Sequence, residues 1–251
     1  MGRGAMDISM ERWYDAVKKR VSVRKYSGDP SKDEIAYLSQ VADYLSSDEV
    51  RIVVGKKAGV FESLIAKTIS GTNTYAAVIT HGKEDEEYLA GTSGEAFVLE
   101  CTSIGLGTCW LGISYNKSVI ASAVKLKKGE KVRCVISIGH FSEKPTHKRS
   151  RKTIYNLTGL EEKAYKKVEN WQKCAVETGR LAPSARNVQP WEFDILSGAI
   201  QVACVSGNFG YGALDCGIAM LHIELGAAHC GVYGSWEIKD RLPVFTADNE
   251  A

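Results

Sequence analysis

The alternation of apolar and polar positions predicts a mixed protein in which helices and short strands follow one another. Trp13, Ala16 and Val17 have the i, i+3, i+4 spacing of one helix face, so residues 11–26 begin as an amphipathic helix. A second helix is predicted from the cap Ser31, with Glu34 as its capping-box partner, to about Leu45. The remaining pattern predicts strands at 50–54, 75–80 and 132–138, helices at 89–104, 160–179 and 214–230, and a hairpin of 191–196 and 200–205. The tail after Arg241 is expected to be irregular.

Two segments of the chain match at a constant offset. GTSGEAFVLECTSIGLGTCW starts at Gly91 and GIAMLHIELGAAHCGVYGSW starts at Gly217, and 217 − 91 is 126. Each segment reads as a helix, then a glycine that ends it, then a tryptophan five residues further on, at Trp110 and Trp236. We interpret the match as an internal duplication.

The two halves are unequal. The first, residues 11–155, continues after its tryptophan through a strand and a basic loop, whereas the second, residues 156–251, soon ends. We therefore expect the second copy to have lost its tail. A half that cannot close its own core packs against its sister. The expected fold class is α+β, with two unequal repeats that form one intimately packed unit, an intramolecular pseudo-dimer.

Composition narrows the function by exclusion. The chain has 32 Lys and Arg against 30 Asp and Glu, and this balance argues against a general nucleic-acid or membrane-surface binder. No apolar run approaches the roughly 18–20 residues of a membrane span, and the N-terminus lacks the apolar stretch of a signal peptide. The seven cysteines include no CxxC, and the histidines miss the usual ligand spacings. We expect reduced thiols in a cytoplasmic protein, and no metal site.

The first motif with chemical content is Arg20-Val-Ser22-Val-Arg24. In an extended segment, alternate side chains share one face, so two guanidinium groups would flank a hydroxyl. Such a set is a good cradle for a phosphate. The alternative is a solvated basic edge of a strand.

A second candidate is the basic run HKRSRK at residues 147–152. It has no interleaved aromatic residues, which disfavours nucleic acid. The run is either a solvated loop or the source of the remaining charge for one phosphate.

The most specific stretch is APSARNVQPW, at residues 182–191. Two prolines fix its backbone, and Ser, Asn and Gln offer donors and acceptors along a rigid loop. Such a loop suits a polar ring edge or a ribityl chain, although a capped connection from helix to strand fits equally well. The chain has neither GxGxxG nor a P-loop, so a Rossmann-type nucleotide site is not expected.

Taken together, four motifs resemble the FMN-dependent nitroreductase family. They are RVSVRKY near the N-terminus, GLGTCWLG after a helix, KRSRK after a strand, and APSARNVQPW, and together they cover about a quarter of the chain. The resemblance implies a nitroreductase-like mixed α+β fold that dimerises extensively, with FMN at the dimer interface.

The order of the motifs departs from the family pattern. A usual member carries PSxxNxQPW soon after RxSxR, whereas here it stands only in the second half, which has neither RxSxR nor KRSRK. The resemblance implies that the first half keeps the phosphate side of the site and the second half keeps the loop. It implies that the chain belongs to the duplicated, single-chain branch of the family, in which one chain is a fused pseudo-dimer. Such a chain would be a monomer with one FMN.

The resemblance also implies a role for individual residues, and no protein acid or base is among them. Arg20 and Arg24 would contact the FMN phosphate, with Ser22 nearby, and Arg149 and Arg151, or Lys148 and Lys152 in a shifted register, would complete the phosphate clamp. Pro183, Ser184 and Asn187 would touch the isoalloxazine and ribityl groups, and Asn73 or Lys67 would meet the pyrimidine edge. Trp110, Leu111 and Gly112 would lie beside the flavin, with the Gly112 amide a candidate donor to N5.

The implied activity is a ping-pong transfer of hydride from NADH or NADPH, through FMN, to a small acceptor such as a nitroaromatic or a quinone. Relatives of this fold also perform other flavin chemistry, such as dehalogenation or oxidation, and nothing in the chain selects among these reactions. A flavin-binding or flavin-storage protein without turnover, and a degenerate pseudo-enzyme with an empty pocket, are the alternatives.

Overall fold

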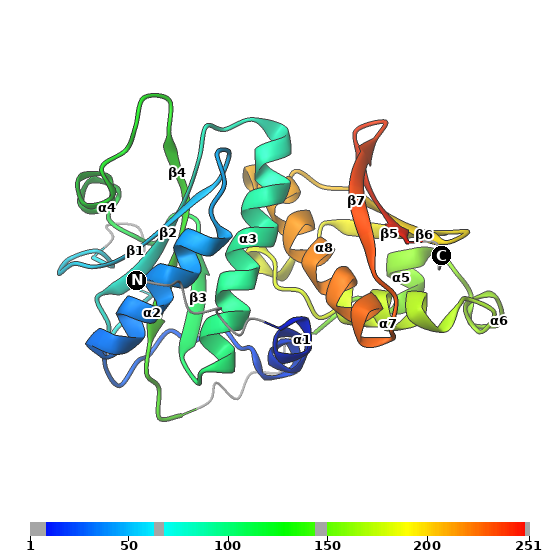
Figure 1. Ribbon diagram of the computed structural model, residues 1–251, viewed down its shortest axis with the longest axis horizontal. Helices are drawn as coiled ribbons and strands as arrows, with labels where there is room; N and C mark the ends of the chain where they lie inside the picture. Colours follow the sequence, from blue (N-terminus) through cyan, green and yellow to red (C-terminus); the bar gives the residue numbers. More distant parts are fainter. Residues whose placement is uncertain (1–8, 63–67, 144–149, 249–251) are drawn as a thin grey trace, which may run out of the picture.

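Two four-stranded antiparallel sheets form the framework of the computed structural model, which describes residues 9–62, 68–143 and 150–248 (Figure 1). The first sheet has the order β1-β2-β4-β3 and the second has the order β5-β6-β8-β7, so the two follow the same connectivity. Their strands are β1 (Arg51–Lys56), β2 (Thr74–Thr80), β3 (Gly107–Leu111), β4 (Lys131–Gly139), β5 (Trp191–Leu196), β6 (Ala199–Cys204), β7 (Gly234–Lys239) and β8 (Leu242–Ala247). The fold is thus mixed α and β, as the sequence predicts.

Two long helices, α3 (Glu84–Ser103) and α8 (Gly212–His229), lie side by side between the sheets (Figure 1). The other helices are α1 (Met10–Lys19), α2 (Lys32–Leu45), α4 (Lys117–Val124), α5 (Ile154–Thr158), α6 (Glu162–Tyr165) and α7 (Asn170–Gly179), with short 3-10 turns η1 (Ala185–Asn187) and η2 (Asn208–Gly210). The largest apolar core runs through this centre, because it joins Phe97 and Ile136 of the first half to Ile218 and Phe245 of the second. No described helix is both long and apolar enough to cross a bilayer.

The two central helices approach each other through paired glycines. A Cβ on Gly91 would overlap the carbonyl oxygen of Leu214, and a Cβ on Gly217 would overlap the carbonyl oxygen of Tyr88. The two contacts are equivalent under the repeat, because 217 − 91 and 214 − 88 are both 126. The close approach lets the Thr92 hydroxyl donate to the Gly217 carbonyl at 3.1 Å. Only glycine fits at either crossing position.

The same offset relates the ends of these helices. Gly105 follows α3 with a φ of 87°, and Gly231 follows α8 with a φ of 80°. In both turns the residue after the glycine donates its N–H to a carbonyl five residues earlier, at 2.9 and 3.0 Å. This is the Schellman arrangement that a glycine stop produces. Helices 89–104 and 214–230 are therefore confirmed, although α3 begins earlier, at Glu84.

Local signals near the N-terminus are also confirmed. Trp13, Ala16 and Val17 are the buried residues of α1. Ser31 caps α2, and its capping box with Glu34 is complete, since Ser31 Oγ accepts from Glu34 N and a Glu34 carboxylate oxygen accepts from Ser31 N at 2.7 Å. The strands near 50–54, 75–80 and 132–138 and the hairpin 191–196 with 200–205 are present with bounds shifted by one or two residues.

The single helix expected over residues 160–179 is wrong. The structure has α6, a break, and then α7. Glu169 is extended, with φ −58° and ψ 148°, and its carboxylate accepts the Trp171 indole N–H at 2.8 Å. Most side chains from 161 to 169 are exposed, so no buried face stabilises a continuous helix there.

The irregular tail expected after Arg241 is also wrong. Residues Leu242–Ala247 form β8, which pairs with both β6 and β7. It occupies the place in its sheet that β4 occupies in the first. Such a short segment, with Pro243 inside it, has little strand signal of its own, and its pairing with β6 is long-range.

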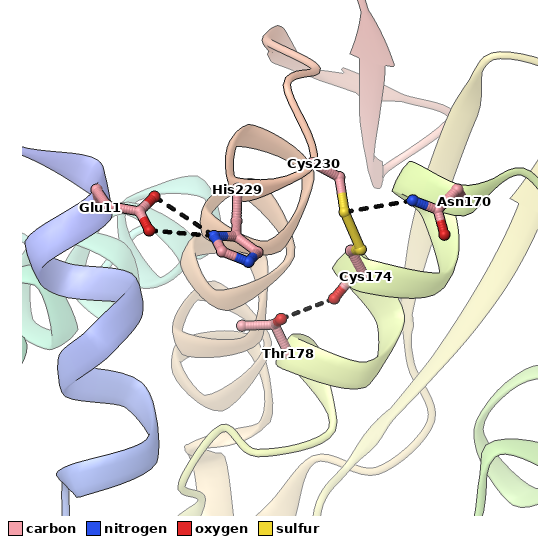
Figure 2. Close-up of a disulfide and its surroundings, with 6 residues drawn as sticks. All are labelled: Glu11, Asn170, Cys174, Thr178, His229 and Cys230. Carbon is pink, nitrogen blue, oxygen red and sulfur yellow. Dashed lines mark hydrogen bonds and ion pairs between the residues drawn. A yellow bond between two sulfur atoms is a disulfide. The ribbon is translucent and has the colours of Figure 1, made fainter.

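The expectation that all the thiols are reduced is wrong for one pair. Cys174 on α7 and Cys230 at the end of α8 form a disulfide, with their Cα atoms 6.6 Å apart (Figure 2). The two residues are 56 positions apart, so no short cysteine motif in the sequence predicts that they pair. The remaining five cysteines form no disulfide. The disulfide fastens α7 to α8, and beside it His229 contacts Glu11 of α1 at 3.2 Å (Figure 2).

We expect Gly91→Ala and Gly217→Ala each to lower the free energy of unfolding by about 1–3 kcal/mol, because the added methyl group would push two helix backbones apart. Gly28→Ala is the matched control, since nothing lies within 4 Å of its Cβ position. Urea titrations of the three variants measure the difference. A crossing variant as stable as the control would contradict the packing described here.

Candidate functional site

A cavity of about 810 Å³ lies between the two halves of the chain, beside the first turns of α8. Its size falls within the range of roughly 300–1,000 Å³ that is typical of cofactor and small-molecule sites. The first half contributes Ser22, Arg24, Cys109, Trp110, Leu111, Gly112, Ile113, Ser114 and Cys134; the second half contributes Pro183, Ser184, Ala185, Arg186, Asn187, Phe209, Tyr211, Leu214, Asp215 and Ile218.

The extended segment after α1 supplies a cation and a hydroxyl. It runs beside β3, where the Val23 N–H donates to the Thr108 carbonyl at 2.8 Å. Val23 points into the core and is 1% exposed. Side chains alternate along an extended segment, so Ser22 and Arg24 face the cavity together. The predicted alternation holds for these two residues.

Arg20 does not join them at the cavity wall. It is the C-cap of α1, and its extended conformation begins only there. Its buried guanidinium lies beside the Glu95 carboxylate, with Nε 3.6 Å from Oε1. The face predicted for Arg20, Ser22 and Arg24 therefore breaks at its first member, because Arg20 turns toward a buried carboxylate on α3.

Glu95 lies behind the cavity wall and fixes the lining residue Trp110. It is fully buried on α3 and accepts the Trp110 indole N–H at 2.8 Å through Oε2, while its Oε1 lies 3.1 Å from Nε2 of the buried His222. The Nδ1 of His222 in turn faces the Thr178 carbonyl at 3.2 Å. A buried carboxylate needs such partners to remain in the interior. They hold Trp110 in one position, beside Leu111 and Gly112.

The loop from Pro183 to Asn187 forms the opposite wall, as predicted. Asn187 Oδ1 accepts from Arg151 Nη1 at 2.8 Å, and Arg151 Nη2 donates to the Leu181 carbonyl at 3.0 Å. Arg151 itself does not line the cavity. It comes from the segment after β4, so this contact fastens the first half to the loop of the second.

The other predicted residues are not among the described residues that line the cavity. Arg149, Lys148 and Lys67 fall outside the described residues. Asn73 is exposed, and its backbone N–H donates to Asp29 at 2.7 Å. It does not line the cavity.

Sequence reasoning missed Asp215, whose carboxylate is 2% exposed and lines the cavity. Oδ1 accepts the Ala185 N–H at 3.0 Å, and Oδ2 accepts from Asn208 Nδ2 at 2.6 Å. Asn208 Nδ2 also donates to the Ala185 carbonyl at 3.0 Å. Burial raises the pKa of Asp215 to about 6, although these hydrogen bonds act in the opposite direction. We call this set of contacts the Asp215 clasp, since it ties two cavity loops to α8.

Arg186 and Phe209, also missed, form an exposed pair where those two loops meet. The guanidinium carbon of Arg186 lies 4.5 Å from the centre of the Phe209 ring. Both residues have left-handed backbone, with φ of 54° and 56°. That conformation costs roughly 1–2 kcal/mol per non-glycine residue, whereas an exposed cation–π contact is worth about 0.5–1 kcal/mol. Their mutual contact therefore does not offset the strain.

Tyr211 joins the two halves across the cavity. Its hydroxyl donates to the Gly112 carbonyl at 3.0 Å, and the Arg133 guanidinium lies 4.3 Å from its ring centre. A Cβ on Gly112 would lie 2.5 Å from the Tyr211 hydroxyl oxygen, so a larger residue there would displace the Tyr211 side chain. The sequence signal that could have indicated Tyr211 and Phe209 is the glycine- and aromatic-rich stretch GNFGYG at residues 207–212.

The fold and the cavity define a nitroreductase-like protein, and the comparisons with known proteins agree. The family model described as "Putative TM nitroreductase" matches residues 12–227. The chain therefore belongs to this nitroreductase family, a group of oxidoreductases. A search of curated proteins found no match.

A solved structure from Thermotoga maritima shows the same fold. A "putative nitroreductase" from Thermotoga maritima is 20% identical, with a TM-score of 0.67, and the alignment covers 98% of this chain and 95% of that one. An "FMN-dependent Nitroreductase" from Clostridium difficile R20291 is 20% identical, with a TM-score of 0.44 and coverage of 61% of this chain and 96% of that one.

The Asp215 clasp predicts a pH dependence. The folded-state pKa of about 6 is above the ordinary 3.8, so the folded chain holds this proton more tightly than the unfolded chain. The contribution of Asp215 to stability is therefore fully present below about pH 4 and is lost as the pH rises through 6. A pKa difference of about 2 corresponds to roughly 3 kcal/mol.

We expect Asp215→Asn, which cannot ionise, to flatten the fall in unfolding free energy between about pH 4 and pH 7.5. The exposed Asp194, which accepts from Gln201 at 3.1 Å, supplies the control Asp194→Asn. Denaturant titrations across this pH range measure the slopes. Equal slopes for Asp215→Asn and the unmodified chain would show that Asp215 does not titrate in this window.

Proposed function

We propose that the protein is an FMN-dependent oxidoreductase that takes hydride from NADH or NADPH and reduces a small acceptor such as a nitroaromatic or a quinone. The observation that carries the proposal is the composite cavity. Its walls bring the Ser22 and Arg24 segment of one half together with the Pro183–Asn187 loop of the other. These are the two motifs that the family resemblance assigns to a single flavin site.

The chemistry of the lining fits FMN. Arg24 and Ser22 offer a cation and a hydroxyl for a phosphate. Trp110, Leu214 and Ile218 offer apolar surface for a planar ring system. FMN combines these two features, an anionic tail and a large aromatic head. The Gly112 amide remains our candidate donor to the flavin N5.

When bound, FMN supplies the hydride and electron transfer chemistry. The residues of this chain would bind the cofactor, orient it and shield it from water. Arg24 would neutralise the phosphate, the hydroxyl of Ser184 and the amide of Asn187 would meet polar edges, and Trp110, fixed by Glu95, would set the position of the ring. The side-chain amide of Asn187 already accepts from Arg151 and donates to the Ser150 carbonyl, so a hydrogen bond to the flavin would form in addition to these two.

We further propose that the chain is a fused pseudo-dimer with one FMN site. The reciprocal contacts of Gly91 and Gly217 support it, because in a two-fold interface each residue meets the partner of its own counterpart. The shared strand order of the two sheets supports it as well. Because each motif occurs only once in the chain, we expect one flavin site rather than two.

The purified protein is expected to bind FMN at about one per chain, and the bound flavin is expected to lose its colour on addition of NADH or NADPH. Flavin that binds but is not bleached would favour a flavin-binding or storage protein instead. Absence of binding after incubation with FMN would favour a degenerate pseudo-enzyme. Absorption spectroscopy distinguishes these outcomes.

Arg24→Gln is expected to weaken FMN binding about tenfold or more, because a charge-assisted contact to phosphate is lost. Lys25→Gln removes the same charge from the next residue, which does not line the cavity, and is expected to leave the affinity unchanged. Fluorescence titration of FMN measures both. Equal losses would mean that net charge, rather than a contact from Arg24, determines binding.

Light scattering is expected to give a mass near the 27.4 kDa of one chain, since the fused pair already satisfies the family's dimer interface. A mass of about twice that value would contradict the proposed pseudo-dimer, because a second interface would then be needed.

A further inference from the structure

The exposed pair Arg186 and Phe209 has no role in the function proposed so far. Phosphate binding falls to Arg24 and Ser22, and ring contacts fall to deeper residues such as Trp110. Phe209 nevertheless stands 77% exposed, although it lines the cavity. Arg186 is exposed too, and in the described part of the chain no carboxylate pairs with it. The cavity thus has an aromatic face and an unneutralised cation at its outer edge.

The fold holds this pair in place despite its backbone strain. Asn187 N donates to the Ser184 carbonyl at 3.0 Å, and Gln189 N donates to Ser184 Oγ at 2.8 Å, which fixes the loop around Arg186. The Asp215 clasp then ties this loop to the loop that carries Phe209. Strained residues that the surroundings hold so firmly are concentrated at binding sites.

We propose that Arg186 and Phe209 form the acceptor platform, and that it selects small planar aromatic compounds with an anionic substituent such as a carboxylate. Phe209 offers a ring face for stacking, and the planar guanidinium of Arg186 matches a carboxylate in bidentate geometry. Ile113, 45% exposed on the facing wall, adds apolar surface from the first half. This inference rests on the proposed function, because it assigns the acceptor of that reaction.

Other charges at the cavity leave this assignment intact. The carboxylate of Asp215 faces Ala185 N and Asn208, which occupy both of its oxygens. Among the described residues, Arg24 is the other cation of the lining, and it lies on the first half, with the phosphate side of the site. Arg186 is the cation that remains for an acceptor.

The test is calorimetric titration of the FMN-loaded protein with benzoate and with benzamide, which have the same shape but differ in charge. Benzoate is expected to bind about tenfold more tightly, as expected for one charge-assisted contact. Arg186→Gln is expected to bring the ratio of the benzoate and benzamide affinities to about one, and Arg186→Lys is expected to leave an intermediate ratio. The control Arg180→Gln removes an equal charge from the residue that follows α7, which does not line the cavity, and is expected to keep the ratio of the two affinities.

A second variant isolates the aromatic face. Phe209→Gly is expected to weaken benzoate and benzamide alike, about fivefold or more, while the unfolding midpoint stays the same or rises, because glycine adopts a positive φ without strain. Phe209→Tyr is expected to retain both affinities. Equal binding of the two compounds by the unmodified protein, or an unchanged ratio in Arg186→Gln, would overturn the proposal. The proposal would also be overturned if Arg186→Gln lost affinity for NADPH alone and kept its affinity for benzoate.

Steady-state rates with 4-nitrobenzoate and 4-nitrobenzamide extend the test to turnover, and the same preference is expected in kcat/KM. The two proposals fail in different ways. A flavin that NAD(P)H does not bleach, in a protein that still prefers benzoate, would refute the proposed oxidoreductase and leave the platform. A bleachable flavin in a protein without the preference would refute only the platform.

Discussion

The close approach of α3 and α8 is the constraint on which the rest of the structure depends. Gly91 and Gly217 let the two backbones meet without intervening side chains, so the helices form one central layer. The two sheets then stand on either side of that layer (Figure 1). Since each sheet brings its own loops to the boundary, any cavity there receives one wall from each half.

Buried polar groups fix the details of those walls. Glu95 holds Trp110 from behind and lies between Arg20 and His222, and the Asp215 clasp holds the opposite loops. Both carboxylates lie on the central helices, so the layer that joins the halves also orients the cavity. Buried ionisable groups are costly unless they are paired, and they persist here where they position side chains around a site.

Strain is concentrated in the same place. Of the non-glycine residues with positive φ in the described ranges, Arg186, Asn187, Gln189, Asn208 and Phe209 belong to the two loops tied together by the clasp. A chain selected only for stability would place glycine or asparagine at such positions. Side chains as large as Arg and Phe there are consistent with a binding role for this edge.

The sequence by itself determined the local features. The Ser31 capping box, the glycine stops at 105 and 231, and the hairpin around residues 197–198 follow from signals within a few residues, and the structure confirms each. The motifs also predicted that Ser22, Arg24 and the Pro183–Asn187 loop would share one cavity. Backbone preferences and alternation are encoded locally, so they can be read without a partner.

Only the tertiary structure decided which distant groups meet. Arg20 turned to Glu95, Arg151 held Asn187, and Cys174 met Cys230, although nothing near any of these residues specifies its partner. β8 exists because β6 and β7 accept it, and the raised pKa of Asp215 exists because folding buries it. Pairing energies and desolvation depend on the whole packed chain, and for that reason the sequence indicated the site but not the contacts that hold it.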